Sequence, residues 1–323
     1  MTLTPVDRLG PFALLLLLLA AGFGATWGSF LNVCIARIPR GMSVISPPSH
    51  CFACGARVRA RDNIPILSYF LLRGRCRTCG AKFSARHALV EALTGALSVL
   101  VLWFFVLEAP GLPLGGRVAR YAVYFTFAAV LVVLTFIDLD TKRLPDVITL
   151  PAIGFFFLAG FATGEIVWWE RALGAALGYG LVRVISDAYY YATGREGLGL
   201  GDGKLLAMMG ALLGWKALPA IVCAASFVGI LVSIPVLLVQ RRRRRQAATA
   251  PPASAQGPGS PADPPAAADM AAAPLAPRSI RHAEVPFGPF LSASALVYVF
   301  QQARIWGFID TAGNAIARTI LGG

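Results

Sequence analysis

Two short stretches of this 323-residue chain place acidic side chains beside apolar runs long enough to cross a membrane. Asp138 ends one such run, and Asp202 lies in the glycine-rich segment 197–204 that precedes another. Two carboxyl groups that share a partly dry site cannot both ionise cheaply, so one proton is held between them. One group can then act as a base toward water while the other donates to a carbonyl oxygen, which is the chemistry of peptide-bond hydrolysis.

Glycines surround Asp202 and distinguish its segment from an ordinary helix start. They let an extended backbone approach closely and leave room for a substrate strand, and they are Gly199, Gly201 and Gly203. Lys204 follows directly. The segment is not a phosphate loop, because that motif requires glycine six residues before the lysine and a hydroxyl residue after it, and leucine stands at both places. The sequence therefore predicts that these glycines and Lys204 support an active site.

The other acidic residues near apolar runs have simpler interpretations. Asp140 is predicted to be a solvated loop charge. Asp146 precedes an apolar run, so it is predicted either to support the active site or to cap a helix N-terminus. Arg183 and Asp187 lie four residues apart within an apolar run, which predicts an intramembrane ion pair facing the helix bundle.

Four of the six cysteines form two C-x2-C pairs separated by 21 residues, and they are Cys51, Cys54, Cys76 and Cys79. Each pair offers two thiolates at one turn, so the two pairs can enclose one tetrahedral Zn²⁺, although the gap is slightly longer than usual. Four thiolates leave no open position for water or substrate, so the predicted zinc is structural. His50 and His87 flank the pairs and could substitute as ligands, but beside four thiolates they are predicted to be plain loop residues.

Composition indicates the class of protein that must position these groups. Hydrophobic residues make up 57% of the chain and charged residues 14%, whereas about 25% of an average globular chain is charged. The sequence therefore predicts an all-α polytopic membrane protein with a small zinc-ribbon-like loop. The first apolar run is predicted to be a retained anchor rather than a signal peptide. About eight transmembrane helices are predicted, roughly at 11–36, 90–109, 119–137, 147–164, 172–192, 205–215, 218–239 and 287–304.

The excess of basic side chains, a net charge of +13, predicts the orientation. With the N-terminus outside, the segments assigned to the cytoplasm carry 21 of the 29 Lys and Arg residues, and the outer segments carry 7. This bias agrees with the positive-inside rule, so the charge marks topology and contact with membrane lipid rather than binding to nucleic acid. The cysteine pairs and both aspartate stretches are thereby predicted on the cytoplasmic face, where disulfides are rare.

The predicted spans divide the chain into five regions. They are a first transmembrane helix at 1–36, a cytoplasmic cysteine loop domain at 37–89, a six-helix membrane core at 90–240, a basic run and linker at 241–286, and a last helix with a C-terminal tail at 287–323. Segment 246–283 is rich in Ala, Pro and Gly without periodicity, which predicts a disordered linker. A turn at 214–216 is required, because one long helix there would place five arginines outside.

These residues, with further short motifs, resemble the bacterial prepilin leader peptidases of type IV pili and type II secretion, which are GxGD-type membrane aspartic proteases. The resemblance covers nearly the whole chain in the same order and topology. Beyond the cysteine pairs it is carried by 28–33, 37–39, 63–69, 72–74, 90–91, 138–146, 199–204 and 286–290. One departure is the pair His87-Ala88, which replaces an expected Tyr-Pro.

The resemblance implies that Asp138 and Asp202 are the catalytic pair of an endopeptidase in the inner membrane. Its substrates would be type IV prepilins or type II secretion pseudopilins, cleaved at the cytoplasmic face after the glycine that precedes the apolar pilin helix. Long members of the family commonly also methylate the new N-terminus with S-adenosylmethionine. Nothing in the spacing shows this second activity, and Glu91 with the loop 63–69 is the place predicted for it.

Two other functions remain open from the sequence. The first is a methyltransferase alone, with a structural aspartate pair; replacement of either aspartate by asparagine would then leave cleavage intact. The second is a transporter or membrane scaffold with acidic relays and a zinc-ribbon loop. Such proteins are commonly built from internal repeats, and no repeat of that kind is evident in the sequence.

Overall fold

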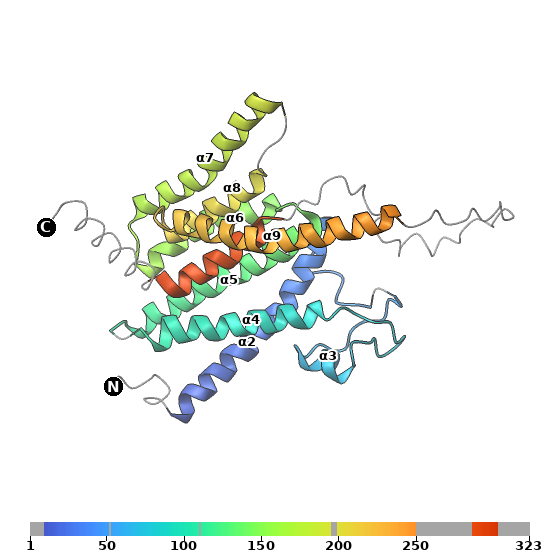
Figure 1. Cartoon of the computed structure of the whole chain (residues 1–323). Helices are drawn as coiled ribbons and strands as arrows, with labels where there is room; N and C mark the ends of the chain where they lie inside the picture. Colours follow the sequence, from blue (N-terminus) through green and yellow to red (C-terminus); the bar gives the residue numbers. More distant parts are fainter. Residues whose placement is uncertain (1–9, 52, 110, 195–198, 250–285, 303–323) are drawn as a thin grey trace, which may run out of the picture. The chain divides into compact units, whose positions relative to one another are not determined.

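The computed structural model describes residues 10–51, 53–109, 111–194, 199–249 and 286–302. Over these residues the regular structure is helical, apart from two isolated β-bridges in the cysteine loop, so the all-α prediction is confirmed. The helices in chain order (Figure 1) are α2 (Pro11–Arg37), α3 (Leu67–Leu71), α4 (Arg86–Leu102), α5 (Leu114–Thr141), α6 (Asp146–Thr163), α7 (Trp168–Thr193), α8 (Leu200–Leu213), α9 (Ala217–Thr249) and a last helix over 288–302.

Five of the described helices are long and apolar enough to cross a membrane, and the chain is therefore a multi-pass membrane protein. They cover Pro11–Arg40, Arg86–Leu107, Leu114–Thr141, Asp146–Thr163 and Ala217–Pro235. Helices also lie at the other three predicted positions. However, α7 carries several charged residues, α8 has only 14 residues, and the last helix is short over its described part, so these three remain predicted spans.

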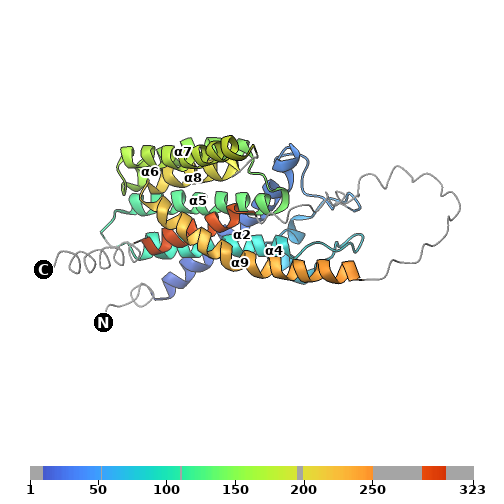
Figure 2. The ribbon, with the colours of Figure 1, turned by 45° about the horizontal axis from the view of Figure 1, so that its top comes forward.

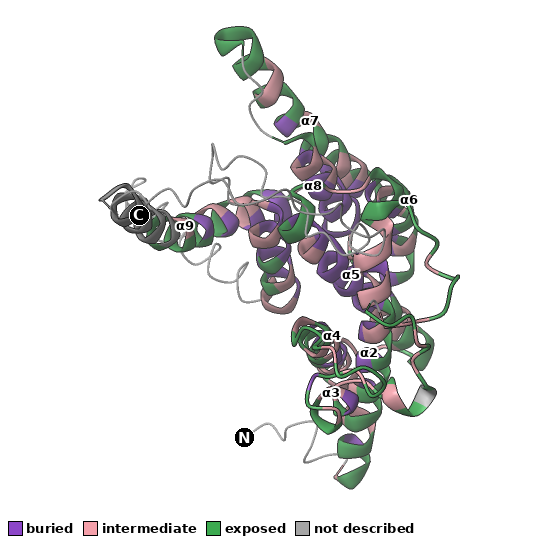
Figure 3. Ribbon diagram, turned by 90° about the vertical axis from the view of Figure 1, so that its right-hand side faces the viewer, coloured by how far each residue is buried: buried purple, intermediate pink, exposed green. Residues whose placement is uncertain are grey.

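Helices α5 and α8 hold the largest share of the buried core. In α5, 67% of the most apolar window is buried, against 28–39% in the other four candidate spans. In α8, every residue from 205 to 213 is buried (purple in Figure 3). Helices α6 and α7 run beside α8 and cover its apolar surface (Figure 2). A helix too short to cross a bilayer is thus enclosed by protein, where it needs no lipid contact.

Helices α7 and α8 approach closely because each presents glycine at their contact. A Cβ atom at Gly210 would lie 2.3 Å from the backbone of Gly174, and a Cβ at Gly178 would lie 2.6 Å from the backbone of Leu206. Small residues at such a crossing let two helix backbones pack tightly. This contact holds α8 in place, and with it the glycine-rich segment at its start.

The predicted turn between α8 and α9 is confirmed. Helix α8 ends at Gly214, whose φ of 76° lies in the region that favours glycine. The backbone N–H of Trp215 donates to the Glu170 carbonyl over 3.2 Å, and the Lys216 ammonium pairs with the Glu170 carboxylate at 2.7 Å. The turn is therefore tied to the first turn of α7.

Helix α9 runs farther than predicted. The sequence predicted a span that ends at 239 and a linker that starts at 246, whereas the helix continues through the arginines 241–245 to Thr249. Arginine and alanine favour helix, so the basic run extends α9 instead of ending it. Most of the predicted linker, and the predicted C-terminal tail, lie outside the described residues. The chain forms two compact units, 1–225 with 286–323, and 226–285, and both candidate sites belong to the first.

Candidate active site

Asp138 lies near the end of α5, inside the protein. The residue is 6% exposed, and its Oδ2 atom has no hydrogen-bond partner among the described residues. The helix ends after Thr141, where the left-handed backbone of Lys142 (φ 53°) turns the chain and its N–H donates to the Asp138 carbonyl over 2.8 Å. A buried carboxyl oxygen without a partner is costly, which favours a functional role over a stabilising one.

Asp202 lies in the first turn of α8, ahead of the predicted span 205–215. Its backbone N–H donates to the Gly199 carbonyl over 3.1 Å, which closes the first turn of the helix. Burial, followed by the negative charge of Asp138, raises the pKa of the Asp202 carboxyl to about 6. Two carboxyl groups 64 residues apart in the sequence thus interact electrostatically in the folded chain. Such a pair can keep one proton near neutral pH.

The three glycines around Asp202 differ in the space beside them. A Cβ atom at Gly203 would lie 3.1 Å from the Val182 side chain of α7, so this glycine is packed. A Cβ at Gly201 would lie 3.3 Å from the Leu144 side chain, in the turn between α5 and α6. At Gly199 the nearest atom would be Asp202 Oδ2 at 3.9 Å, which leaves that side of the segment open.

An ion pair joins the two aspartate stretches. Lys204 Nζ lies 2.5 Å from Asp146 Oδ1, and the Lys204 side chain is only 19% exposed. The first turn of α8 is thereby connected to the first turn of α6. The N-cap of α6 is Pro145 and Asp146 is the first residue of the helix, so the interpretation of Asp146 as the capping residue is wrong.

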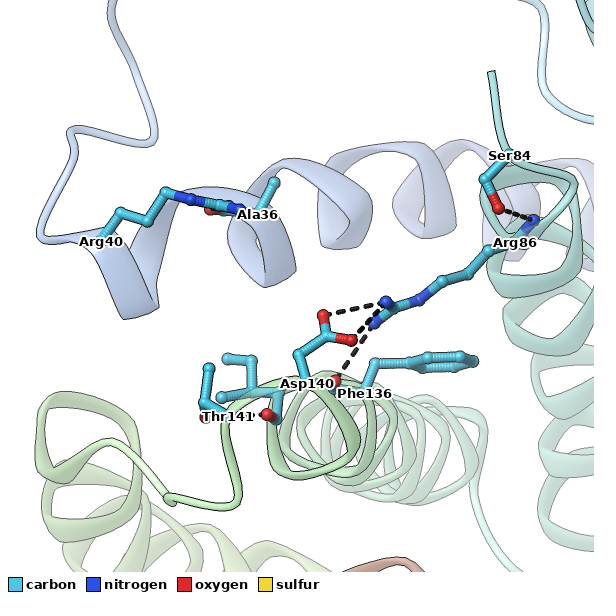
Figure 4. Close-up of polar contacts among 8 residues, drawn as sticks. Ala36, Arg40, Ser84, Arg86, Phe136, Asp140 and Thr141 are labelled. Atoms are coloured by element: carbon cyan, nitrogen blue, oxygen red, sulfur yellow. Dashed lines mark hydrogen bonds and ion pairs between the residues drawn. The ribbon is translucent and has the colours of Figure 1, made fainter. Parts of the chain in front are cut away.

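Arg86, at the start of α4, makes a cluster of contacts with the end of α5 (Figure 4). Its Nη1 lies 2.6 and 2.8 Å from the two Asp140 carboxylate oxygens, and its Nη2 donates to the Phe136 carbonyl over 3.1 Å. The guanidinium also lies over the Phe136 ring. Asp140 is therefore an ion-paired residue of α5, so its predicted loop position is wrong, whereas its side chain is 43% exposed and solvated as predicted. The sequence offered no signal for Arg86, because its partner is 54 residues away.

The predicted pair of Arg183 and Asp187 forms, with Nε and Oδ2 2.8 Å apart. Its predicted direction is wrong, because the two side chains are 48% and 44% exposed and do not face the bundle. This pair is local to α7, whereas the contact of Arg86 joins α4 to α5. Removal of the first pair should affect α7 alone, whereas removal of Arg86 should weaken the contact between α4 and α5.

The structure brings together the sulfur atoms of all four predicted metal ligands. The four atoms lie within 4.8 Å of one another, and the sulfurs of Cys51 and Cys79 are 3.8 Å apart. A tetrahedral zinc with bonds of about 2.3 Å needs sulfur separations of about 3.8 Å. The four sulfur atoms are therefore close enough together to hold one metal ion. His50 and His87 are not part of this cluster. His50 lies in the loop as predicted, whereas His87 lies in the first turn of α4, so its predicted loop position is wrong.

Each C-x2-C pair forms the same turn, shifted by 25 residues. Cys51 N–H donates to the Ala56 carbonyl over 2.9 Å, and Cys76 N–H donates to the Ala81 carbonyl over 2.8 Å. The glycine after each pair has a left-handed backbone, with φ of 68° at Gly55 and 71° at Gly80. The repeat of C-x2-C-G-A in the sequence is the signal for this duplicated turn, which the spacing argument missed.

The turn favours the thiolate at Cys76 but not at Cys79, where contacts with the other thiols outweigh the Ala81 backbone N–H and raise the pKa to about 11. Backbone N–H groups of Cys79 and Thr78 lower the pKa of the Cys76 thiol to about 6. Metals bind the thiolate, so a thiol that ionises below neutral pH suits a ligand. The donor set, the spacing and the turn geometry all fit a closed four-thiolate centre.

A cavity of about 360 Å³ lies between α2, α4 and the cysteine loop. Its wall includes Glu91 and residues of the loop 63–69, the places predicted for methyl transfer. Glu91 Oε2 accepts a hydrogen bond from the Ile66 N–H over 2.7 Å, which ties this loop to α4. Ile66 has a left-handed backbone (φ 63°), an unfavourable conformation for a β-branched residue that this contact helps to hold.

Known proteins match both halves of the chain. Residues 23–105 match the bacterial peptidase A24 N-terminal domain, and residues 125–234 match the type IV leader peptidase family. The first segment contains the four cysteines and Glu91, and the second contains Asp138 and Asp202. The cavity and the aspartate pair thus fall in different matched segments.

Relatives from several bacteria cover most of the chain. The prepilin leader peptidase/N-methyltransferase of Neisseria gonorrhoeae is 36% identical over 256 residues, which is 72% of this chain and 85% of that protein. The protein of the same name from Aeromonas hydrophila is 39% identical over 243 residues, 68% of this chain and 80% of its own. The protein of the same name from Klebsiella pneumoniae is 38% identical over 209 residues, 63% of this chain and 87% of its own. No solved structure matches the chain significantly. The chain belongs to the type IV leader peptidase family.

Proposed function

We propose that this protein cleaves the leader peptides of type IV prepilins with the carboxyl groups of Asp138 and Asp202, and that it methylates the new N-terminus with S-adenosylmethionine. The observation that carries the cleavage step is the meeting of two carboxyl groups from α5 and α8, one of them with a buried, unpartnered oxygen. Relatives named prepilin leader peptidase/N-methyltransferase support both activities.

Cleavage requires one ionised and one protonated carboxyl group. Asp202 holds the proton, because its pKa is raised to about 6 and a bound peptide would exclude more water. The Asp138 carboxylate takes a proton from water as the water oxygen attacks the scissile carbonyl carbon, and Asp202 donates to the carbonyl oxygen. When the C–N bond breaks, the leaving amine takes a proton from the pair. The unpartnered Oδ2 of Asp138 is the oxygen free to contact the water.

The segment around Asp202 orients the peptide. The open side of Gly199 gives an extended substrate backbone a place beside the carboxyl group. Gly201 and Gly203 pack on neighbouring elements, and the pair of Lys204 with Asp146 holds the start of α8 against α6. These residues act by position and make no proton transfer.

The charge bias of the sequence supports a cytoplasmic position for this site. We propose that the N-terminus lies outside the inner membrane and that loop 37–89 and the aspartate pair lie at the cytoplasmic face, beside anionic lipid. A prepilin or type II secretion pseudopilin has a basic leader followed by an apolar helix, so its scissile bond lies at the same depth. The core 90–240 would then cleave it without unfolding a domain.

The cavity of about 360 Å³ is the proposed site for methyl transfer. Its size lies within the usual range for sites that bind small organic molecules. S-adenosylmethionine would supply an electrophilic methyl group there. The Glu91 carboxylate would orient the substrate amine or the cofactor, and the loop 63–69 would close one side. The four cysteines would hold a structural Zn²⁺ that shapes the opposite wall and takes part in no chemical step.

The test uses purified protein in detergent, a prepilin substrate and mass measurement of the products. Loss of the leader mass supports cleavage, and a further gain of one methyl group in the presence of S-adenosylmethionine supports the second activity. Unchanged substrate mass contradicts the proposal. If Asp138→Asn and Asp202→Asn leave cleavage intact, the aspartate pair is not the catalytic pair, as in a protein that is a methyltransferase alone.

A further inference from the structure

We infer that Gly288 is a positioning residue of the cleavage site, through which the last helix holds the buried Asp138 carboxyl group and leaves its Oδ2 atom free of contact with a side chain at position 288. Gly288 begins the helix 288–302 and lies 150 residues after Asp138 in the sequence. The inference rests on the proposed cleavage at Asp138. It adds a third segment of the chain to a site that the sequence had assigned to two.

The distance between these residues leaves no space for a side chain at position 288. A Cβ atom there would lie 2.5 Å from Asp138 Oδ2 and 3.2 Å from Asp138 Cγ. Neither distance is compatible with ordinary packing, and Asp138 is 6% exposed, so its carboxyl group has little room to move. Even one methyl group would therefore occupy the position next to the oxygen that we assign to water activation.

The backbone of Gly288 also interacts with the carboxyl group. Its N–H interacts with the Asp138 carboxyl group, whereas Oδ2 of that group has no hydrogen-bond partner in the described part of the chain. The first N–H groups of a helix lack partners within the helix and favour a negative charge nearby. Gly288 thus supplies a donor that orients the group and, having no side chain, leaves the reactive oxygen uncovered by a Cβ atom.

The last helix is held firmly enough to fix this contact. Its buried residues pack in the same core as α5, and they are Leu291, Ala295, Tyr298 and Val299. Its first turn is closed by hydrogen bonds from the N–H groups of Phe290 and Leu291 to the Phe287 carbonyl, over 3.0 and 3.2 Å. A shift of the helix start that would relieve a clash at 288 must therefore disturb these core contacts.

The first experiment measures leader cleavage by Gly288→Ala. The expected result is a loss of about 100-fold in kcat with KM changed by less than about threefold, since a small displacement of a catalytic group can cost that much. Methylation of a peptide that already lacks its leader should be retained. The matched control is Gly154→Ala in α6, where a Cβ atom would meet nothing within 4 Å, and which should behave as native. Cleavage by Gly288→Ala within about threefold of the native rate would overturn the inference.

A second experiment applies even if Gly288→Ala folds poorly. The Tm is measured for Gly288→Ala in the native background and in an Asp138→Ala background, where the clashing oxygen is absent. The loss of Tm caused by Gly288→Ala should largely disappear in the second background. An equal loss in both would show that Gly288 does not act through Asp138, and would overturn the inference. This readout needs no substrate, so its failure is distinct from absence of cleavage by the native protein, which would contradict the proposed function.

Discussion

The cysteine cluster and the aspartate pair are built in opposite ways. The four cysteines lie within 29 residues of the chain, on two copies of one turn, and two of the four are exposed. The aspartates come from α5 and α8, with Gly288 of the last helix in contact, and Asp138 is buried in the bundle. The first site is set by local hydrogen bonds that bring four thiols together, whereas the second is set by helix packing.

The comparison shows that the two sites depend on different parts of the chain. A site of local turns tolerates changes elsewhere in the fold, but if it binds a metal it depends on that metal. A site assembled from distant helices depends on the whole bundle but on no single local motif. Substitutions at one site should therefore affect one activity and spare the other. Substitutions at contacts between the two regions should affect both.

The largest effect is expected for Asp138→Asn and Asp202→Asn. Each removes a group that transfers a proton, so cleavage should fall by about 10³-fold or more. Methylation of a peptide without its leader should continue at the native rate, because the cavity is lined by other residues. Mass measurement of both products tests this, with Asp187→Asn as the control. Equal loss of both activities would argue against two separate sites.

The next effect is expected for metal removal or Cys76→Ser. Without one thiolate the two turns lose the bond that joins them, and the cavity wall that they form should become disordered. We expect at least about a 10-fold loss of methylation with cleavage within about threefold of native. The control is Cys223→Ser, since Cys223 is outside the cluster. Mass spectrometry of the native protein should find one bound zinc per chain. The Cys76→Ser variant should bind less than one.

A smaller effect is expected where the two regions meet, at Arg86 and Asp140. Their contact is partly exposed, with side chains 32% and 43% accessible, so its coupling in the free energy of unfolding should be about 1 kcal/mol. Arg86→Ala should lower cleavage several-fold, because the end of α5 carries Asp138. The double variant Arg86→Asp with Asp140→Arg should recover part of the loss. If Arg86→Ala and Asp140→Ala add independently in Tm and in cleavage, the two residues are not coupled.

The smallest effect is expected at Arg183 and Asp187. This pair lies within one helix and is about half exposed, and such pairs contribute little to stability. Replacement of both by alanine should change Tm by no more than about 1 °C and leave cleavage and methylation unchanged. A large loss of either activity would show that this part of α7 contacts a substrate.

Much of the fold followed from composition and apolar periodicity. The helices, their order and the turn at 214–216 could be predicted because membrane spans are long apolar runs separated by charge. The end of α9 could not be predicted, because a run of arginines indicates the end of a membrane span in the charge pattern but also favours helix. The direction in which Arg183 and Asp187 face could not be predicted either, because the exposure of their side chains depends on the neighbouring helices.

The sequence by itself determined which residues could do chemistry. The spacing of the cysteines encodes a local turn, and scarce aspartates at the ends of apolar runs are conspicuous because charge at membrane depth is costly. Only the tertiary structure decided which distant residues join them. The contact of Arg86 with Asp140, the tie of Glu91 to Ile66 and the approach of Gly288 to Asp138 link positions 25 to 150 residues apart. Such contacts arise from packing of whole helices, and no local pattern in the chain records them.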